Sequence, residues 1–193
     1  ANKVIARRAL PVDEKQHFPE KLLGETLPDF KTAGKTLHED DAIRLWTLDD
    51  EVLIASIKTK MHAISPDVCE GLNLAVEMAE KDFRGVVVWS GNEPFSVGAD
   101  LQAMLPAFMV AGVSAVEGAE HEMQQTMLRL RYANVPVVSA IRGMALGGGC
   151  ELAVHSARRV VHMESYIGLV EVGVGLVPGA GGLTYIARRA AEN

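Results

Sequence analysis

Two glutamates, twenty positions apart (171 − 151), are the residues of this chain best suited to chemistry. Glu151 lies between Cys150 and Leu152, and Glu171 lies between two valines. Burial raises the pKa of a carboxyl group, and a second carboxylate nearby raises one pKa of the pair further. Such a pair titrates as a unit and can hold a single proton. The apolar neighbours therefore predict an acid/base pair.

A glycine-rich turn accompanies each glutamate, at 143–151 and at 171–182. The first turn follows an apolar run at 137–141 that predicts a strand, and it leads into a segment compatible with a helix. Glycines expose N–H groups that no Cβ screens, and the first N–H groups of a helix have no partner within it. Two such donors aimed at one oxygen form an oxyanion hole, each contributing about 3 kcal/mol. Alternatively, the glycines only permit tight packing and Glu151 is a solvated surface carboxylate; the sequence leaves both open.

Composition excludes several classes of protein. The 193 residues carry 19 Lys and Arg against 25 Asp and Glu, and this net charge of −6 argues against a nucleic-acid partner. No apolar run approaches the ~20 residues that span a membrane. Cys69 and Cys150 are too few for a disulfide framework or a zinc site. We therefore expect a protein of the reducing cytoplasm without a metal ion.

The first 41 residues differ in character from the rest. Pro11, Pro19 and Pro28 lie among mixed charges with little periodicity, which predicts an extended connector over 1–41. Regular strand and helix patterns over 42–193 predict one further domain. Because the chain begins with Ala1 rather than Met and ends within a helical pattern, we expect a fragment of a longer polypeptide.

The elements that must position the glutamates follow one another regularly along this domain. Two β-rich runs around 48–51 predict a hairpin, and Ser65-Pro66-Asp67 predicts the start of a helix. Small apolar residues at 105–118 predict a loop or a loose helix beside a pocket. The other expected elements are strands at 85–90, 137–141, 159–162 and 166–168 and helices over 120–132 and from 183. Repeated strand–strand–helix units predict a mixed α/β fold with its site at the strand-to-helix corners.

Other motifs fail on the residues that their chemistry needs. A dinucleotide fingerprint starting at Gly173 meets Pro178 where its third glycine belongs, and the turn at 181–184 lacks the lysine of a phosphate-binding loop. A zinc-protease helix would need histidine at position 125, which is Gln125. His155 lies one turn from Glu151, and an ordinary packed or surface histidine is expected there.

Three separated stretches resemble the signature blocks of the crotonase family, the enoyl-CoA hydratase/isomerase superfamily. They are FSVGADL at 95–101, GMALGGGCE at 143–151, and the segment from Glu171 to PGAGG at 178–182. The resemblance covers residues 42–193. It implies an α/β fold, a spiral of repeated ββα units, that lacks here the family's C-terminal helices. It also implies a site for an acyl-CoA thioester.

The resemblance also assigns roles to individual residues. Ala99 and Gly148 would supply the oxyanion-hole amides, and Glu151 and Glu171 match the two catalytic glutamates. Both glutamates together favour hydration of a trans-2-enoyl-CoA to the 3-hydroxyacyl-CoA, with Glu171 protonating the α-carbon and Glu151 activating water. Coenzyme A is then part of the substrate, and no metal or redox cofactor is implied. The implied substrate contacts are Met61, Ala63, Val97, Asp100, Leu101, Gly147, Val170 and Gly179.

Alternatives and departures remain beside this interpretation. An isomerase of Δ3,Δ2-enoyl-CoA would use Glu171 alone, and a non-catalytic acyl-CoA-binding module would use neither glutamate. Lys58-Thr59-Lys60 replaces the family's frequent Asn-Arg-Pro, and its lysines either contact CoA phosphates or are solvated. Val170 replaces a common proline, which changes the acyl pocket.

The proline-rich first 40 residues resemble the connector of fused β-oxidation proteins, in which a 3-hydroxyacyl-CoA dehydrogenase precedes the hydratase. We therefore expect a fused dehydrogenase domain or an oligomer, with NAD required only by such a dehydrogenase.

Overall fold

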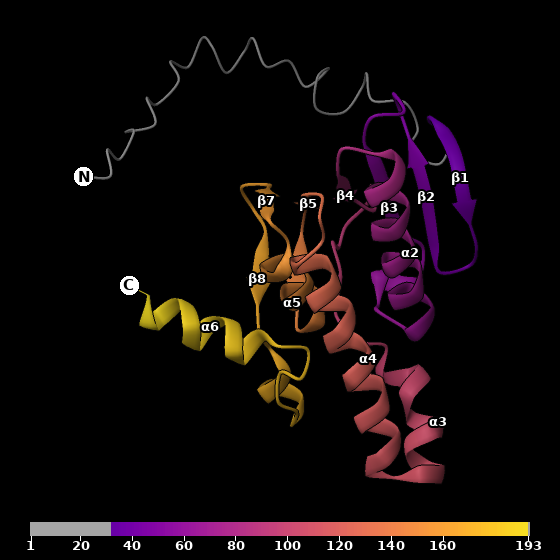
Figure 1. Ribbon diagram of the computed structural model, residues 1–193. Helices are drawn as coiled ribbons and strands as arrows, with labels where there is room; N and C mark the ends of the chain where they lie inside the picture. Colours follow the sequence, from indigo (N-terminus) through magenta and orange to yellow (C-terminus); the bar gives the residue numbers. More distant parts are fainter. Residues whose placement is uncertain (1–31, 193) are drawn as a thin grey trace. The chain divides into compact units, whose positions relative to one another are not determined.

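Two layers of strands organise residues 32–192, the part of the chain that the computed structural model describes (Figure 1). The larger layer is a six-stranded sheet in which β1, β2 and β3 are antiparallel and β3, β4, β5 and β7 are parallel. Its strands are β1 (Lys35–Glu39), β2 (Ile43–Thr47), β3 (Leu53–Ile57), β4 (Val86–Val88), β5 (Val137–Ile141) and β7 (Arg158–Val161). The smaller layer pairs β6 (Met144–Leu146) in parallel with β8 (Tyr166–Gly168).

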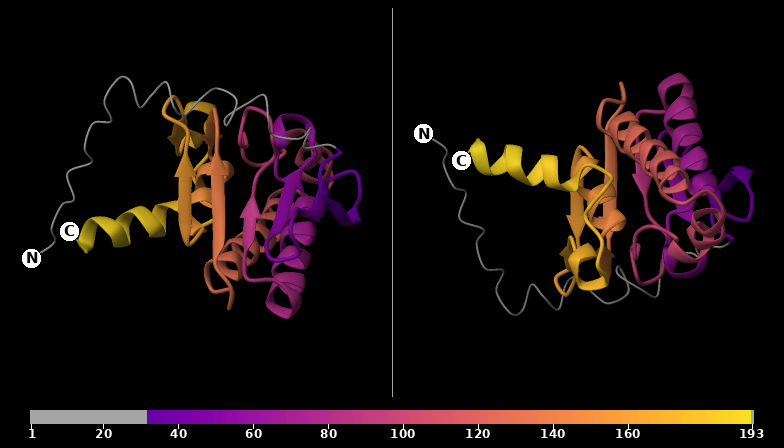
Figure 2. Two further views of the ribbon diagram at one scale, coloured as in Figure 1. Left: turned by 90° about the horizontal axis from the view of Figure 1, so that it is seen from above. Right: turned by 90° about the horizontal axis from the view of Figure 1, so that it is seen from below.

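The helices follow the strands at regular intervals. They are α2 (Pro66–Asp82), α3 (Leu101–Ala111), α4 (Val113–Arg131), α5 (Gly148–His155) and α6 (Gly182–Ala191), with two 3-10 turns, η2 (Lys60–His62) and η3 (Glu171–Val174). Helices α2 and α4 run side by side, and α6 extends away from the strands (Figure 2). Within the described residues, no helix combines the length and the apolar character of a membrane span.

One unit repeats four times along the chain: a strand of the large sheet, a short extended segment of the second layer, and a helix. The large-sheet strands are β3, β4, β5 and β7 in turn. The second-layer segments are Ile64, the stretch at 96–99, β6 and β8, and isolated bridges join Ile64 to Ala99 and Ser96 to Ala145. The second layer therefore runs through the four units, and the strand–strand–helix repeat that the sequence predicted is confirmed.

Local sequence explains where these elements begin and how they pack. Helix α2 begins after Ser65, whose Oγ accepts a hydrogen bond from Val68 N–H (3.3 Å), with Pro66 in the first turn. Its buried face carries Val68, Leu72, Ala75 and Ala79, as the periodicity predicted. Buried strands β2 and β3 form the predicted hairpin beneath this helix.

The structure decides one open prediction about the elements and corrects another. The segment 105–118, predicted to be a loop or a loose helix, is helical, with α3 and α4 separated at Gly112, which adopts a φ of +61°. Strand β1 lies within the range 1–41 that we predicted to be connector, so the large sheet begins at Lys35 rather than after residue 41. Its side chains are exposed or half-buried, which hides the strand from a search for apolar alternation. Residues 1–31 of the predicted connector lie outside the described residues.

Gly149 provides a test of the packing between α5 and the second layer. A Cβ built on Gly149 would lie 2.5 Å from the carbonyl oxygen of Ser96, a backbone atom that cannot move aside freely. We expect Gly149→Ala to lower the free energy of unfolding by about 2 kcal/mol, because overpacking a buried contact forces backbone shifts. Urea unfolding measures the difference. Gly118→Ala, in α4 with open space around it, is the matched control and should not destabilise.

Candidate active site

The three stretches that resemble the family's signature blocks all lie where segments of the second layer end. The stretch at 96–99 leads into α3, β6 leads through Gly147 into α5, and β8 leads through Val170 into η3. Adjacent segments of this layer are bonded to one another, so their ends meet at one edge. The topology therefore brings together residues that are up to 72 positions apart in sequence (171 − 99).

The backbone amides of Ala99 and Gly148 adjoin each other at this edge. Ile64 N–H donates to Gly98 O (2.7 Å) and Asp100 N–H donates to Ile64 O (3.1 Å), which turns Ala99 N–H away from Ile64. Gly148 is the first residue of α5, so its N–H has no partner within the helix. A Cβ built on Gly148 would lie 3.3 Å from Ala99 N.

Within residues 32–192, neither of these two amides donates a hydrogen bond to another protein group. Such free donors at the N-terminus of a helix stabilise negative charge. The two amides are thus suited to hold an oxygen on which charge develops. The oxyanion-hole role that the family resemblance implies for this pair stays a prediction.

Glu151 is buried, with 2% of its surface exposed, one turn into α5. Gly182 N–H donates a hydrogen bond to its Oε1 (2.8 Å), and the nearby backbone of Ala180 also lowers the pKa of the carboxyl group. Burial raises the pKa of the Glu151 carboxyl above its ordinary value, the amide of Gly182 partly offsets this, and the charge of Glu171 raises the pKa further. The alternative of a solvated surface carboxylate is therefore excluded.

Glu171 is the first residue of η3 and faces the same corner. A Cβ built on Gly147 would lie 3.2 Å from Glu171 Oε1, so the carboxylate lies over the residue that precedes the amide of Gly148. The other oxygen, Oε2, is buried and has no hydrogen-bond partner among the described groups. A buried acceptor without a partner is costly in free energy, and such atoms are expected where a ligand supplies the missing bond.

The residues predicted to contact substrate fall into three groups. The first group flanks the segment that carries Ala99 and consists of Met61, Ala63, Val97, Asp100 and Leu101. Within it, Val97 N–H donates to Met61 O (3.3 Å). Gly147 and Val170 immediately precede Gly148 and Glu171 in the chain. Gly179 lies on the loop at 178–182, on the side of Glu151 that faces α4.

Lys58 is exposed, as the solvated alternative expected, but its charge has partners in the fold. Its ammonium group forms an ion pair with Glu39 (2.9 Å) and also contacts the carbonyl oxygen of Asp40. Its charge is thus already compensated by residues of β1 and the following turn. Lys60, in η2, is exposed.

Helix α4 contributes three residues that sequence reasoning missed. The sulfur of Met123 would lie 3.4 Å from a Cβ built on Gly148. Gln124 Nε2 donates to Gly179 O (2.6 Å), and the carboxylate of Glu120 packs directly against Gly179. The spacing of 120, 123, 124 and 127 marks one helical face, a signal that identifies the inner side of α4 but not what it contacts.

Cys150 and His155 are structural neighbours of the glutamates. His155 Nδ1 donates to Glu151 O (2.7 Å), and burial lowers the pKa of the imidazole, which favours the neutral form. Burial raises the pKa of the Cys150 thiol to about 11, so the thiolate nucleophile is scarce at neutral pH. The packed histidine that the sequence predicted is confirmed.

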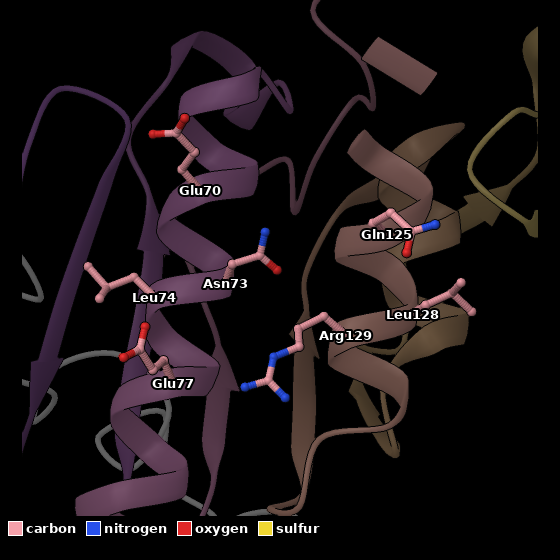
Figure 3. A pocket seen from close by; sticks show the side chains of 7 residues that line it. All are labelled: Glu70, Asn73, Leu74, Glu77, Gln125, Leu128 and Arg129. Atoms are coloured by element: carbon pink, nitrogen blue, oxygen red, sulfur yellow. The ribbon is translucent and has the colours of Figure 1, made fainter. Parts of the chain in front are cut away.

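A separate groove of about 720 Å³ lies between α2 and α4 (Figure 3). Arg129 points into it but is already bound to both carboxylate oxygens of Glu80, at 3.1 and 2.6 Å. The lining residues are Glu70, Asn73, Leu74, Glu77, Gln125, Leu128 and Arg129. None of the predicted site residues is among them, so this groove is separate from the glutamate corner.

Comparison with known proteins identifies a family and two relatives of this chain. The family model described as enoyl-CoA hydratase/isomerase matches residues 52–193. The chain is 38% identical over 156 residues to a Rickettsia felis protein named as a fatty acid oxidation complex trifunctional enzyme, covering 81% of this chain and 22% of that protein. It is 37% identical over 130 residues to the peroxisomal bifunctional enzyme of Cavia porcellus, covering 66% of this chain and 17% of that enzyme.

Among solved structures, the enoyl-CoA hydratase from Bacillus anthracis superposes with a TM-score of 0.67 at 26% identity, over 76% of this chain and 57% of that one. The chain thus spans about a fifth of the length of the curated relatives and just over half of the length of this hydratase. The family match, the repeated ββα units and the solved relative agree on one assignment. The chain belongs to the enoyl-CoA hydratase/isomerase family and has the crotonase fold.

Proposed function

We propose that this chain hydrates trans-2-enoyl-CoA thioesters to 3-hydroxyacyl-CoA in fatty-acid oxidation. The observation that carries the proposal is the meeting of two carboxylates and two unpaired amides at one corner of the second layer. The names of the relatives, which include fatty-acid oxidation enzymes, support the substrate class.

The amides of Ala99 and Gly148 hold the thioester oxygen. As water adds to the β-carbon, the double-bond electrons move toward the thioester and its oxygen gains the charge of an enolate. Donors already in place at that position stabilise the charge without reorganisation, and each contributes about 3 kcal/mol to the lowering of the barrier.

The glutamates handle the protons. Ionised Glu151 takes a proton from the attacking water, and protonated Glu171 gives a proton to the α-carbon as the enolate collapses. The raised pKa of Glu151 suits a base that must work near neutral pH. The unpartnered Oε2 of Glu171 is free to exchange a proton with the substrate.

The remaining predicted contacts then surround the acyl-CoA. Met61, Ala63 and Val97 flank the segment that carries Ala99, and Asp100 and Leu101 follow it. On the opposite side, the substrate contacts are Gly147, Val170 and Gly179.

The whole protein is proposed to be a cytoplasmic multifunctional enzyme. Its hydratase part would be joined to a 3-hydroxyacyl-CoA dehydrogenase, which alone would use NAD. The name of the Rickettsia felis relative, a fatty acid oxidation complex trifunctional enzyme, supports a multifunctional chain.

The direct test is an assay with crotonyl-CoA. Full-length protein should remove the enoyl-thioester absorbance, and heat-denatured protein should not. If full-length protein leaves the absorbance unchanged, hydration is the wrong reaction. Calorimetric titration with an acyl-CoA, run beside an assay with a 3-enoyl-CoA, then separates an isomerase from a binding module. Binding without turnover of either substrate supports the module.

A second candidate function is isomerisation of Δ3,Δ2-enoyl-CoA by Glu171 alone. The observation that favours it is the asymmetry of the pair: Glu151 accepts a hydrogen bond from the amide of Gly182, whereas Oε2 of Glu171 has no partner within residues 32–192.

Gly98 offers a test of the amide pair itself. Its φ of +93° lies in the left-handed region, and a Cβ there would lie 2.8 Å from both Gly148 N and Leu146 O. We expect Gly98→Ala to separate the two amides and to lower kcat for hydration by about 10²-fold, the cost of one lost donor. Gly112→Ala is the matched control, because Gly112 has a φ of +61° but open space around it. Equal activity of the two variants would contradict the role of the amides.

A further inference from the structure

The loop at 178–182 connects α4 with the Glu151 carboxylate. At one end, Gln124 Nε2 donates a hydrogen bond of 2.6 Å to the carbonyl oxygen of Gly179. At the other end, Gly182 N–H donates to Glu151 Oε1 at 2.8 Å, and the backbone of the buried residue Ala180 lies near enough to favour the ionised carboxylate. Only a few backbone atoms therefore separate the Gln124 amide from the groups that hold Glu151.

The loop itself has little intrinsic preference for this conformation. Three of its five residues are Gly179, Gly181 and Gly182, and Gly181 adopts a left-handed φ of +101°. Glycine populates many backbone conformations, so the position of such a loop is set by the contacts that it makes. Its C-terminal end is fixed by α6, in which Tyr185 N–H donates to Gly181 O (3.0 Å). At its N-terminal end, the carbonyl oxygen of Gly179 accepts the hydrogen bond from Gln124, and the carboxylate of Glu120 packs against Gly179.

We propose that Gln124 is a positioning residue for Glu151, acting by anchoring the 178–182 loop whose backbone amides orient the carboxylate. The effect on turnover rests on the proposed hydratase function, whereas the anchoring of the loop does not. Gln124 is far in sequence from both glutamates and does not itself bond to Glu151, so its effect passes through the loop.

The groups around Glu151 explain why the position of the 178–182 loop affects the pKa of this carboxyl group. The charged or titratable groups that face Glu151 are Glu171 from η3, Glu120 from α4, and Cys150 and His155 from its own helix. Neither Glu171 nor Glu120 favours the ionised form of Glu151, and the amides of Gly182 and Ala180 do. If the loop loosens, these amides withdraw and the pKa of Glu151 rises further. Because the base must be ionised, the acidic limb of the activity profile moves to higher pH.

The test compares Gln124→Met with Gln125→Met in the full-length protein. Methionine keeps the length of the side chain and removes its N–H donor. Gln125 lies on the same helix, but it is exposed and lines the groove between α2 and α4 (Figure 3), so it is a matched control. We expect Gln124→Met to lower kcat about tenfold with KM nearly unchanged, because a displaced catalytic group costs chiefly turnover. Its acidic limb should move to higher pH, and Gln125→Met should match the wild type in all three quantities.

Hydrogen–deuterium exchange provides a readout that does not depend on activity. Amides of the 178–185 segment should exchange faster in Gln124→Met than in the wild type or in Gln125→Met. Unchanged exchange in Gln124→Met, or loss of turnover without a shift of the acidic limb, would overturn the inference. If the wild type does not hydrate crotonyl-CoA but the segment still loosens in Gln124→Met, the proposed function fails and the anchoring by Gln124 stands.

Discussion

Replacement of Glu171 by glutamine should lower kcat for crotonyl-CoA hydration about 10²- to 10⁴-fold, the usual contribution of a general acid or base. Isomerisation of a 3-enoyl-CoA should fall with it, since both reactions move a proton at the α-carbon. The carboxylate lies over Gly147, and its Oε2 makes no hydrogen bond among the described groups. Glutamine fills the same volume but cannot deliver or accept that proton at neutral pH.

Three measurements separate this chemical loss from a structural one. Urea unfolding should show a free energy of unfolding close to that of the wild type, because Oε2 accepts no hydrogen bond from the part of the chain that the structure describes. Titration calorimetry should still detect binding of a saturated acyl-CoA, since the amides of Ala99 and Gly148 are unchanged. Retention of either reaction within tenfold of the wild-type rate would show that another group moves the proton at the α-carbon.

The sequence was most informative where burial is strong and local. Strands β2 and β3 and helix α2 were predicted because their apolar residues recur at the period of a buried strand or of one helical face. Strand β1 was missed because it is an exposed edge strand, whose pairing with β2 depends on the sheet and not on its own side chains. Helices α3 and α4 were underestimated because Pro106 and Gly112 interrupt a run of small residues.

In the candidate site too, residues marked by their local sequence were identified, and residues that depend on long-range contacts were missed. Glu151 and Glu171 were identified because acids within apolar and glycine-rich sequence are unusual, and the structure places Glu151 in the buried position expected of it. Glu120 and Gln124 were missed because their importance comes from the packing of α4 against the 178–182 loop, 55 positions away (179 − 124). A helical pattern shows which side of α4 faces inward, but contacts of this range depend on the whole fold.

Glu151→Gln should separate the two candidate reactions. We expect it to lower kcat for hydration about 10²- to 10⁴-fold, because the base that activates water is removed. Isomerisation should stay within tenfold of the wild type, since that reaction needs only Glu171. The substitution is conservative for the fold: an amide oxygen in place of Oε1 can still accept the hydrogen bond from Gly182 N–H. Parallel assays with crotonyl-CoA and a 3-enoyl-CoA measure both rates on the same protein.

The dependence on pH gives an independent test of the same assignment. Burial holds the pKa of Glu151 above the ordinary value of a glutamate, and the charge of Glu171 adds to this effect. A base with a raised pKa is already protonated at a pH where an ordinary glutamate is still ionised. Wild-type hydration should therefore decline, as the pH falls, at a pH above the ordinary pKa of a glutamate. The residual hydration of Glu151→Gln should lack this limb, because glutamine does not titrate. If both reactions fall together in Glu151→Gln, or if the limb persists, Glu151 is not the base that activates water.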